Sequence, residues 1–386
     1  MRGCTVGRRL LGTALAVALA ACGEPAAPVP PPPPPDVTAA VVPLGNPFTV
    51  ASRYARNVWD MQAFGGLIHL GHGDSIENWG PVSLWSIDPA TGALASAFTT
   101  SDEQVDVFRV LNGELYAPGH DPREDLTLGN FYRVEAGRWV KHRTIPHGLH
   151  TFDLAWHDGL LFAALGADSL PGHETLEVSA DRGRTWRAAG AVLDRMFGMF
   201  ELGGVLYAAP SLHRGFAPGV RQPWRWNGTA FVPTGTGMEA LLPGVPEGEQ
   251  GRMARQTEFA GALVYVVGLR GFDWYPAALA VTRDVRTAQR VALPDAAALP
   301  FDLLVRGGTL YLLTGTPAGN GGYTVRVYAT TDLARWTELF HFSAPTFARS
   351  FEESGGDFFF GLGGQYGAAS PATGDLLRVP RAAYAR

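Results

Sequence analysis

Short apolar runs alternate with glycine-containing turns from about residue 42 to the end of the chain. One arrangement recurs seven times: a glycine, then two or three mostly apolar residues with an aromatic ring among or just after them. The glycines that begin it are Gly66, Gly113, Gly159, Gly204, Gly261, Gly308 and Gly356, at intervals of 47, 46, 45, 57, 47 and 48 residues. Repeats of this length are typical of the blades of a propeller.

Every repeat predicts the same order of strands. A first strand, such as residues 107–111, precedes the glycine turn, and a second, such as residues 115–118, follows it. After a loop of variable length comes a third strand, at residues 83–87, 131–134, 176–179, 224–226, 278–281, 325–329 and 376–379. Helical periodicity is nearly absent. We therefore expect an all-β, seven-bladed β-propeller of four-stranded antiparallel blades, with six blades as the alternative.

The seventh repeat has no room for a fourth strand after residue 379. Residues 47–53 (P-F-T-V-A-S-R) form an apolar strand candidate before the first repeat. We expect this N-terminal segment to complete the last blade, because a closed ring leaves no sheet edge exposed.

The N-terminus has the pattern of a secretory signal, with basic residues before a short apolar segment at residues 10–21. This segment is too short to span a bilayer. Leu19-Ala20-Ala21-Cys22 resembles the bacterial lipobox, in which cleavage precedes a cysteine that is then lipidated; ordinary secretion with a free Cys22 is the alternative. We expect a signal peptide at residues 1–21, the lipidated cysteine and a proline-rich linker at 22–41, and the propeller domain at 42–386.

The expected location follows from that signal. A lipid on Cys22 would anchor an extracytoplasmic domain to the bacterial cell envelope, and the absence of Asp after Cys22 favours the outer membrane if the host is Gram-negative. Without residues 1–21, 28 Lys and Arg face 36 Asp and Glu, which argues against nucleic acid as a partner. We expect a monomer whose partners are the membrane and a glycan or protein ligand.

The chain shows no pattern for a cofactor. Cys4 leaves with the signal peptide, so no disulfide can form within the mature chain. No phosphate-binding or dinucleotide fingerprint stands between a strand and a helix, and no histidine spacing supports zinc. We therefore expect neither a cofactor nor a metal.

Residues 179–186 read S-A-D-R-G-R-T-W, which matches the Asp-box pattern S-x-D-x-G-x-T-W. Asp181 can accept hydrogen bonds from amides of its own turn, Gly183 can adopt a positive φ, and Trp186 can bury its ring between sheets. We interpret Ser179, Asp181, Gly183, Thr185 and Trp186 as structural. Incomplete relatives stand at residues 87–92, 282–284 and 330–336.

This motif resembles the turn repeated through Asp-box (BNR-repeat) sialidase-like β-propellers. The resemblance implies a propeller fold and, in the sialidases, an arginine cluster with a Tyr/Glu nucleophile pair and an Asp acid. The Arg-Ile-Pro segment of those enzymes is absent, and Ala55-Arg56-Asn57-Val58 stands in a comparable place. No sialidase catalytic residue is therefore transferred to this chain.

Loops between second and third strands should rim one face of the ring, and they are rich in aromatic and polar side chains. Aromatic rings beside charged groups suit carbohydrates or small polar ligands, whereas the alternative is that these loops only bond one another. The candidate ligand-binding residues are His72, Asp74, Trp79, His120, Asp121, Arg270, Asp273, Trp274 and Tyr275.

Acidic residues also recur on the first strands. Asp60, Asp153 and Asp302 precede their repeat glycine by six residues, and Asp106 precedes its glycine by seven. Gathered around a central channel, they could serve catalysis or bind a cation; alternatively, each bonds amides of the neighbouring blade. We favour a binding or scaffold module. The alternative is a sialidase-like glycoside hydrolase or lyase, which needs an acid pair roughly 5–9.5 Å apart.

Overall fold

The computed structural model describes residues 33–385, apart from residues 75, 78, 126, 167–174, 193, 213–220, 271–273 and 320, and it describes only the backbone of Arg270. The compact unit runs from Pro34 to Arg386, so it also includes residues 34–41. Its regular structure within the described residues is 30 strands and four short 3₁₀ helices: η1 (Thr38–Ala40), η2 (Tyr54–Arg56), η3 (Met238–Leu241) and η4 (Arg381–Ala383). None of these helices combines the length and hydropathy that crossing a membrane requires.

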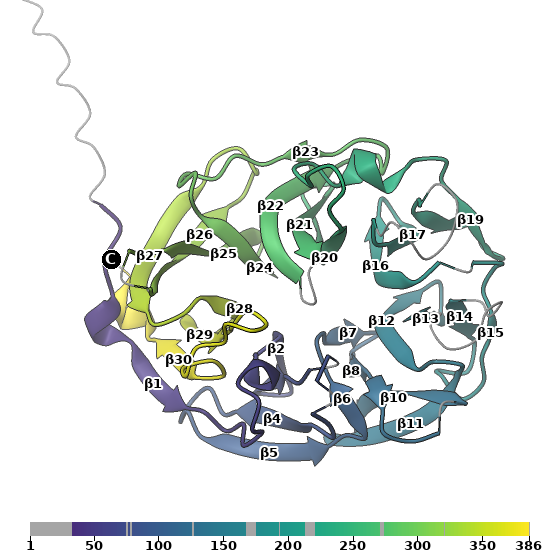
Figure 1. Ribbon diagram of the computed structural model, residues 1–386, viewed down its shortest axis with the longest axis horizontal. Coiled ribbons are helices and arrows are strands. Elements are labelled where there is room, and N and C mark those ends of the chain that lie inside the picture. Colours follow the sequence, from purple (N-terminus) through teal and green to yellow (C-terminus); the bar gives the residue numbers. More distant parts are fainter. Residues whose placement is uncertain are drawn as a thin grey trace, which may run out of the picture. The chain divides into compact units, whose positions relative to one another are not determined.

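Seven antiparallel sheets stand around a common centre, so this unit is a seven-bladed β-propeller (Figure 1). Blade 1 contains β2 (Asp60–Phe64), β3 (Leu67–Gly71), β4 (Ser83–Ile87) and β5 (Leu94–Thr99). Blade 2 contains β7 (Arg109–Leu111), β8 (Glu114–Pro118), β10 (Leu128–Glu135) and β11 (Arg138–Pro146). Blade 3 contains β12 (His150–His157), β13 (Leu160–Gly166), β14 (Leu176–Ser179) and β15 (Arg187–Ala188).

The remaining blades repeat this order, with the first strand innermost. Blade 4 contains β16 (Met196–Leu202), β17 (Val205–Pro210), β18 (Trp224–Trp226) and β19 (Phe231–Pro233). Blade 5 contains β20 (Gly251–Phe259), β21 (Ala262–Arg270), β22 (Trp274–Thr282) and β23 (Gln289–Arg290). Blade 6 contains β24 (Leu299–Arg306), β25 (Thr309–Pro317), β26 (Tyr323–Thr330) and β27 (Thr337–Ala344). Blade 7 contains β28 (Ala348–Ser354), β29 (Asp357–Leu362), β30 (Leu376–Val379) and the N-terminal β1 (Val42–Gly45).

The ring closes through β1, which pairs antiparallel with β30 as the outermost strand of blade 7. An N-terminal closing strand was expected, but its predicted residues, 47–53, were wrong. Those residues must carry the chain from the outer edge of blade 7 to the innermost strand of blade 1, so they cannot remain in the sheet (Figure 1). Phe48 is nevertheless buried and packs on the His72 ring, which explains the apolar pattern of the segment.

The hydrophobic core is divided among the contacts between neighbouring blades. The cluster between blades 6 and 7 is rich in phenylalanine and includes Phe301, Phe340, Phe351 and Phe360, all 2% exposed or less. Burial of a phenylalanine side chain stabilises a fold by about 1.5–3 kcal/mol. The blades are therefore held together by apolar side chains of their strands, including the fourth strand in blade 6.

The Asp-box turn joins β14 to β15. Asp181 accepts hydrogen bonds from the backbone amides of Arg184 and Thr185, and its carboxylate also bonds the Ser179 and Thr185 hydroxyls. Gly183 has φ +86°, and a Cβ there would lie 2.4 Å from Cζ of Phe131 in blade 2. Trp186 packs against the same Phe131 ring and donates a hydrogen bond to Thr144. The turn thus joins blade 3 to blade 2.

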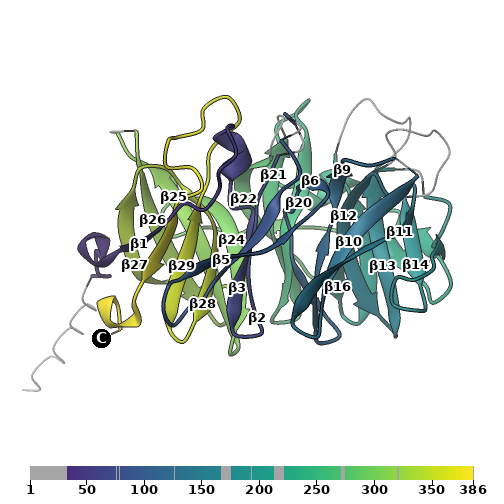
Figure 2. The ribbon, with the colours of Figure 1, turned by 90° about the horizontal axis from the view of Figure 1, so that it is seen from below.

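One face of the ring carries an additional pair of short strands. β6 (Asp102–Gln104), from the connection between blades 1 and 2, pairs with β9 (His120–Pro122), and β9 in turn pairs with β12. Figure 2 shows β6, β9 and η2 at the same face of the propeller. This pairing fixes a loop of blade 2 against the first strand of blade 3.

Candidate functional site

A cavity of about 250 Å³ lies at the centre of the ring, between the innermost strands. Its lining includes the side chains of Asp60, Asp106, Asp153, Asp302 and Glu352, of Arg109, Arg252, Arg255 and Arg306, and of Phe152, Phe197 and Trp274. All four acids singled out from the sequence therefore face one cavity. Its volume lies just below the range of about 300–1,000 Å³ that is usual for small-molecule sites.

Three of these acids have the same bonds. One carboxylate oxygen of each accepts the amide of the next residue, and the other accepts an amide on, or just before, the inner strand of the following blade. Asp60 bonds Met61 and Phe108, Asp153 bonds Leu154 and Met199, and Asp302 bonds Leu303 and Phe351. The donor–acceptor distances are 2.6–3.1 Å. These acids fasten one blade to the next, which is the structural alternative that the sequence left open.

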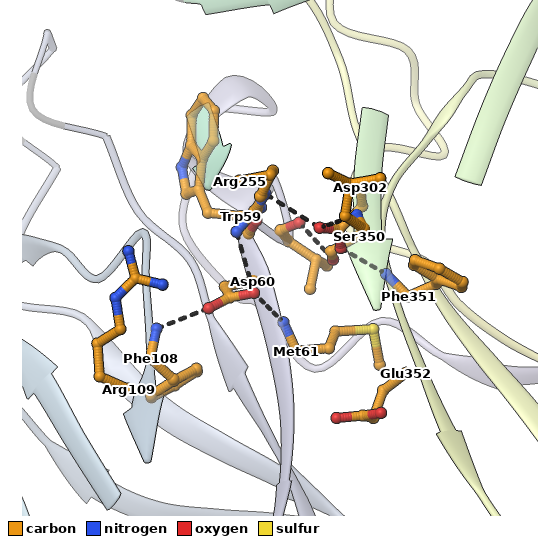
Figure 3. Close-up of polar contacts among 12 residues, drawn as sticks. Trp59, Asp60, Met61, Phe108, Arg109, Arg255, Asp302, Ser350, Phe351 and Glu352 are labelled. Carbon is orange, nitrogen blue, oxygen red and sulfur yellow. Dashed lines mark hydrogen bonds and ion pairs between the residues drawn. The ribbon is translucent and has the colours of Figure 1, made fainter. Parts of the chain in front are cut away.

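Blade 5 carries an arginine where blades 1, 3 and 6 carry an acid. Arg255 precedes Gly261 by six residues, the same offset at which Asp60 and Asp302 precede their glycines. Its guanidinium lies 3.0 Å from Asp60 and 3.2 Å from Asp302, and it also donates to the Trp59 carbonyl (Figure 3). Arg255 thus reaches across the centre of the ring from blade 5 to blade 1. The six-residue offset could have revealed it from the sequence.

Two further arginines lie near the inner strands: Arg109 lines the cavity, and Arg349 stands outside its lining. Arg109 binds Asp153 with two hydrogen bonds of 2.8 Å. Arg349 is fully buried, donates to Asn57, and lies 4.2 Å from the centroid of the Trp59 ring. The two arginines lie in separate contacts.

Asp106 differs from the other acids of the cavity. No hydrogen bond from another described side chain reaches its carboxylate, although Arg252 and Arg255 interact with it electrostatically. Burial raises the pKa of Asp106, and these arginines oppose the rise. Burial likewise raises the pKa of Asp60 and of Asp302, again against the effect of Arg255.

The predicted ligand-binding residues do not form one group. His72 is buried and contacts the carbonyls of Ala55 and Ser83, and Asp74 is buried and accepts the Ile76 and Glu77 amides of its own loop. Trp79 is 41% exposed and donates to Glu77. Their loop is bonded to Ala55 and to β6, since the Gly73 amide donates to the Ala55 carbonyl and the Asp74 amide to that of Glu103.

The candidates on blade 5 separate in the same way. Trp274 lines the central cavity, whereas Tyr275 packs beside Phe301 and Phe347, with its hydroxyl 3.3 Å from that of Tyr323. Asp273 and the side chain of Arg270 lie outside the described residues, as does Cys22.

His120 and Asp121 lie together on β9, and the structure adds His150 from β12. Burial lowers the pKa of His120 to about 3. Phe152 connects this trio to the cavity, since its ring lies 4.8 Å from that of His120 and also lines the central space. Sequence reasoning missed His150 because it stands 30 residues from His120, on another blade.

No family model matches the chain, and no curated protein matches it. Among solved structures, it is similar to a chain of the mitotic checkpoint complex, with 13% identity and a TM-score of 0.54 over 97% of this chain and 99% of that one. It is also similar to the GH74 xyloglucanase from Xanthomonas campestris, with 14% identity and a TM-score of 0.52 over 82% of this chain. The match covers 52% of the xyloglucanase.

A third similar structure is the β-propeller domain of the Trilobed protease from Pyrococcus furiosus, with 9% identity and a TM-score of 0.47 over 78% of this chain and 87% of that one. At such identities, the first two similarities show the fold alone. The chain has the architecture of a β-propeller, built around a central polar cavity.

Proposed function

We propose that this protein is a binding or scaffold propeller that holds a glycan at its central cavity. The observation that carries the proposal is the bonding of Asp60, Asp153 and Asp302: each carboxylate accepts two backbone amides and also pairs with an arginine. Acids held in this way stabilise the ring and are poorly placed to donate a proton to a substrate.

The cavity lining supports a small polar ligand. Phe152, Phe197 and Trp274 contribute aromatic rings to the lining, while Asp106 and Arg252 contribute a carboxyl group and a guanidinium group. Rings that cover apolar sugar faces, beside charged groups that bond hydroxyls, are a common basis of carbohydrate recognition. A volume of about 250 Å³ favours a single sugar unit, such as the end of a longer chain.

A glycan-array screen of the purified protein tests this function. The cavity variants Phe197→Ala and Asp106→Asn should lose the captured glycan, whereas the loop variant Trp79→Ala should retain it. Loss in Trp79→Ala alone would move the ligand to the outer loops. Absence of glycan binding by the wild-type protein at millimolar concentration would contradict the proposal.

The second candidate function is a sialidase-like glycoside hydrolase or lyase, and Asp106 is the observation in its favour. A half-buried acid with a raised pKa that lines a cavity is a candidate proton donor. A panel of chromogenic glycosides that includes sialosides distinguishes the two functions. Turnover by the wild-type protein that disappears in Asp106→Asn would favour the enzyme.

Two finer parts of the proposal rest on sequence patterns. The complete Asp box at residues 179–186 supports kinship with BNR-repeat propellers, and the lipobox at Cys22 supports a lipid anchor in the cell envelope. Cys22→Ser should abolish labelling by a fatty-acid probe and release the protein from membranes. Membrane retention of the unlabelled variant would contradict the anchor.

A further inference from the structure

His120, Asp121 and His150 converge beside the central cavity. β9 pairs with β12 at His120 and His150, which places the two imidazoles side by side with ring centroids 5.4 Å apart. Asp121 follows His120 directly; its carboxylate lies 4.0 Å from Nε2 of His120 and forms an ion pair with Nδ1 of His150. One nitrogen or oxygen of each residue lies within 4.8 Å of those of the other two.

The burial and hydrogen bonding of His120 provide evidence that is independent of the distances within the trio. Its side chain is 10% exposed, and its Nδ1 is buried without a hydrogen-bond partner in the described part of the chain. A buried polar atom left unbonded typically costs about 1–3 kcal/mol. His120 therefore has hydrogen-bonding or ligand-binding capacity that the described part of the propeller does not use.

The surroundings hold the three side chains in place. The Phe152 ring lies edge-on to His120 at 4.8 Å and stacked on His150 at 5.7 Å. Asp121 has φ +58°, a left-handed conformation fixed by the pairing of β9 with β6 and β12. Such packing reduces the entropy that the ligands would lose on binding an ion.

Two imidazoles and one carboxylate form a ligand set that suits divalent transition metals, and catalytic zinc sites commonly use three protein ligands of this kind. Ligand atoms around zinc are about 3–3.5 Å apart if each bond is about 2.1 Å long. The widest separation within the trio is at most 4.8 Å, and closing it by about 1.5 Å would reach that spacing, whereas Asp121 and Nδ1 of His150 are already in contact. We propose that His120, Asp121 and His150 bind one divalent transition-metal ion of the zinc class.

The positive charges near the proposed site determine which ligand could bind the ion at a coordination position that the protein leaves open. Arg195 and Arg252 both interact electrostatically with His120, and both guanidinium groups lie over the Phe197 ring, at 5.7 and 5.4 Å. A divalent ion beside two arginines attracts an anionic oxygen, such as a carboxylate or phosphate. Because Phe197 and Arg252 also line the central cavity, the proposed metal site adjoins that cavity.

Isothermal titration of the chelator-treated, purified protein with Zn²⁺ tests the site. The wild-type protein should bind one Zn²⁺ ion at micromolar affinity or tighter. Asp121→Asn keeps the size of the side chain, and asparagine tolerates the positive φ. Loss of a residue that only bonds a metal ligand weakens binding roughly 10- to 100-fold, so loss of the Asp121 carboxylate should weaken Zn²⁺ binding by more than that. His120→Ala should do the same.

His157→Ala is the matched control, because His157 lies on the same strand as His150 and pairs with Glu201 outside the trio. It should bind Zn²⁺ like the wild-type protein. Thermal unfolding with and without Zn²⁺ provides a second measurement: the ion should raise Tm in the wild-type protein and in His157→Ala, but not in Asp121→Asn. Absence of stoichiometric binding, or equal affinity in the wild-type protein and Asp121→Asn, would overturn the proposal.

Discussion

Four hydrogen bonds converge on the carboxylate of Asp153: two from Arg109, one from the Leu154 amide and one from the Met199 amide. The side chain is only 1% exposed, so its carboxylate relies on these partners. At the residue scale, the acids of the central cavity therefore contribute to stability through the partners they satisfy.

Asp153→Asn tests this role because it keeps the shape of the side chain and removes its charge. Arg109, whose side chain is 25% exposed, would lose its counter-ion, so the cost should lie at or below the about 3–5 kcal/mol that breaking a fully buried pair typically costs. We expect urea unfolding to show a loss of this order. Asp158 lies in the hairpin turn that follows the same strand, and its side chain is 76% exposed. Asp158→Asn should therefore change stability by less than about 0.5 kcal/mol. Equal effects would contradict a structural role for Asp153.

His72 predicts a dependence of stability on pH. Burial lowers the pKa of His72 to about 4, so the unfolded chain takes up a proton at a higher pH than the folded chain does. Stability is then lost as pH falls from about 6.5 toward 4, by up to about 3 kcal/mol. His72→Gln should show a smaller difference in unfolding free energy between pH 7 and pH 4 than the wild-type protein. An unchanged difference would contradict the assignment.

At the scale of the element, the Asp-box turn depends on close contact as well as on backbone conformation. Gly183 and Gly159 both have positive φ, +86° and +79°. A Cβ at Gly159 would meet nothing within 4 Å, whereas one at Gly183 would strike Phe131 of the preceding blade. The motif therefore locks two blades together in addition to reversing the chain.

The paired variants Gly159→Ala and Gly183→Ala separate these effects. Gly159→Ala should cost only the backbone strain, about 1–2 kcal/mol. Gly183→Ala should cost about 1–3 kcal/mol more, because Phe131 must move. Thermal or urea unfolding measures both. A smaller cost at Gly183 than at Gly159 would show that the turn does not need this contact.

At the scale of the whole molecule, stability depends on closing the ring with β1. Its backbone covers β30, and residues just before it also contact the ring: Val37 is buried in the core of blades 6 and 7, and Asp36 forms a bridge to His341. Without these residues, β30 would present an unpaired edge.

Deletion of residues 1–46 should therefore lower Tm and cause association through the exposed edge of blade 7. Deletion of residues 1–33 keeps β1 and should leave both Tm and the oligomeric state unchanged. Differential scanning calorimetry and size-exclusion chromatography measure the two effects. If the longer deletion behaves like the shorter one, the ring does not require its N-terminal strand.

The sequence by itself determined the number of blades and most of their strands. The repeat spacing and the apolar runs are local signals, and the third strands predicted at residues 176–179, 224–226 and 376–379 coincide with β14, β18 and β30. The closing strand was misplaced because residues 47–53 are apolar for another reason: Phe48 is buried beneath the loop of His72. A hydrophobic pattern reports burial and does not report hydrogen bonding within a sheet.

Only the tertiary structure decided what the polar residues contact. Arg255 meets Asp60 across 195 residues, and His150 meets His120 through a pairing between two blades. Such contacts depend on how the ring closes, and no local periodicity records them. Burial was also not evident from the sequence. His72 and Asp74 stand in a loop that was expected to expose them, yet both side chains are buried, and burial lowers the pKa of His72. The spacing of the repeats and their apolar runs therefore predict the architecture, whereas the candidate site depends on contacts between distant parts of the chain.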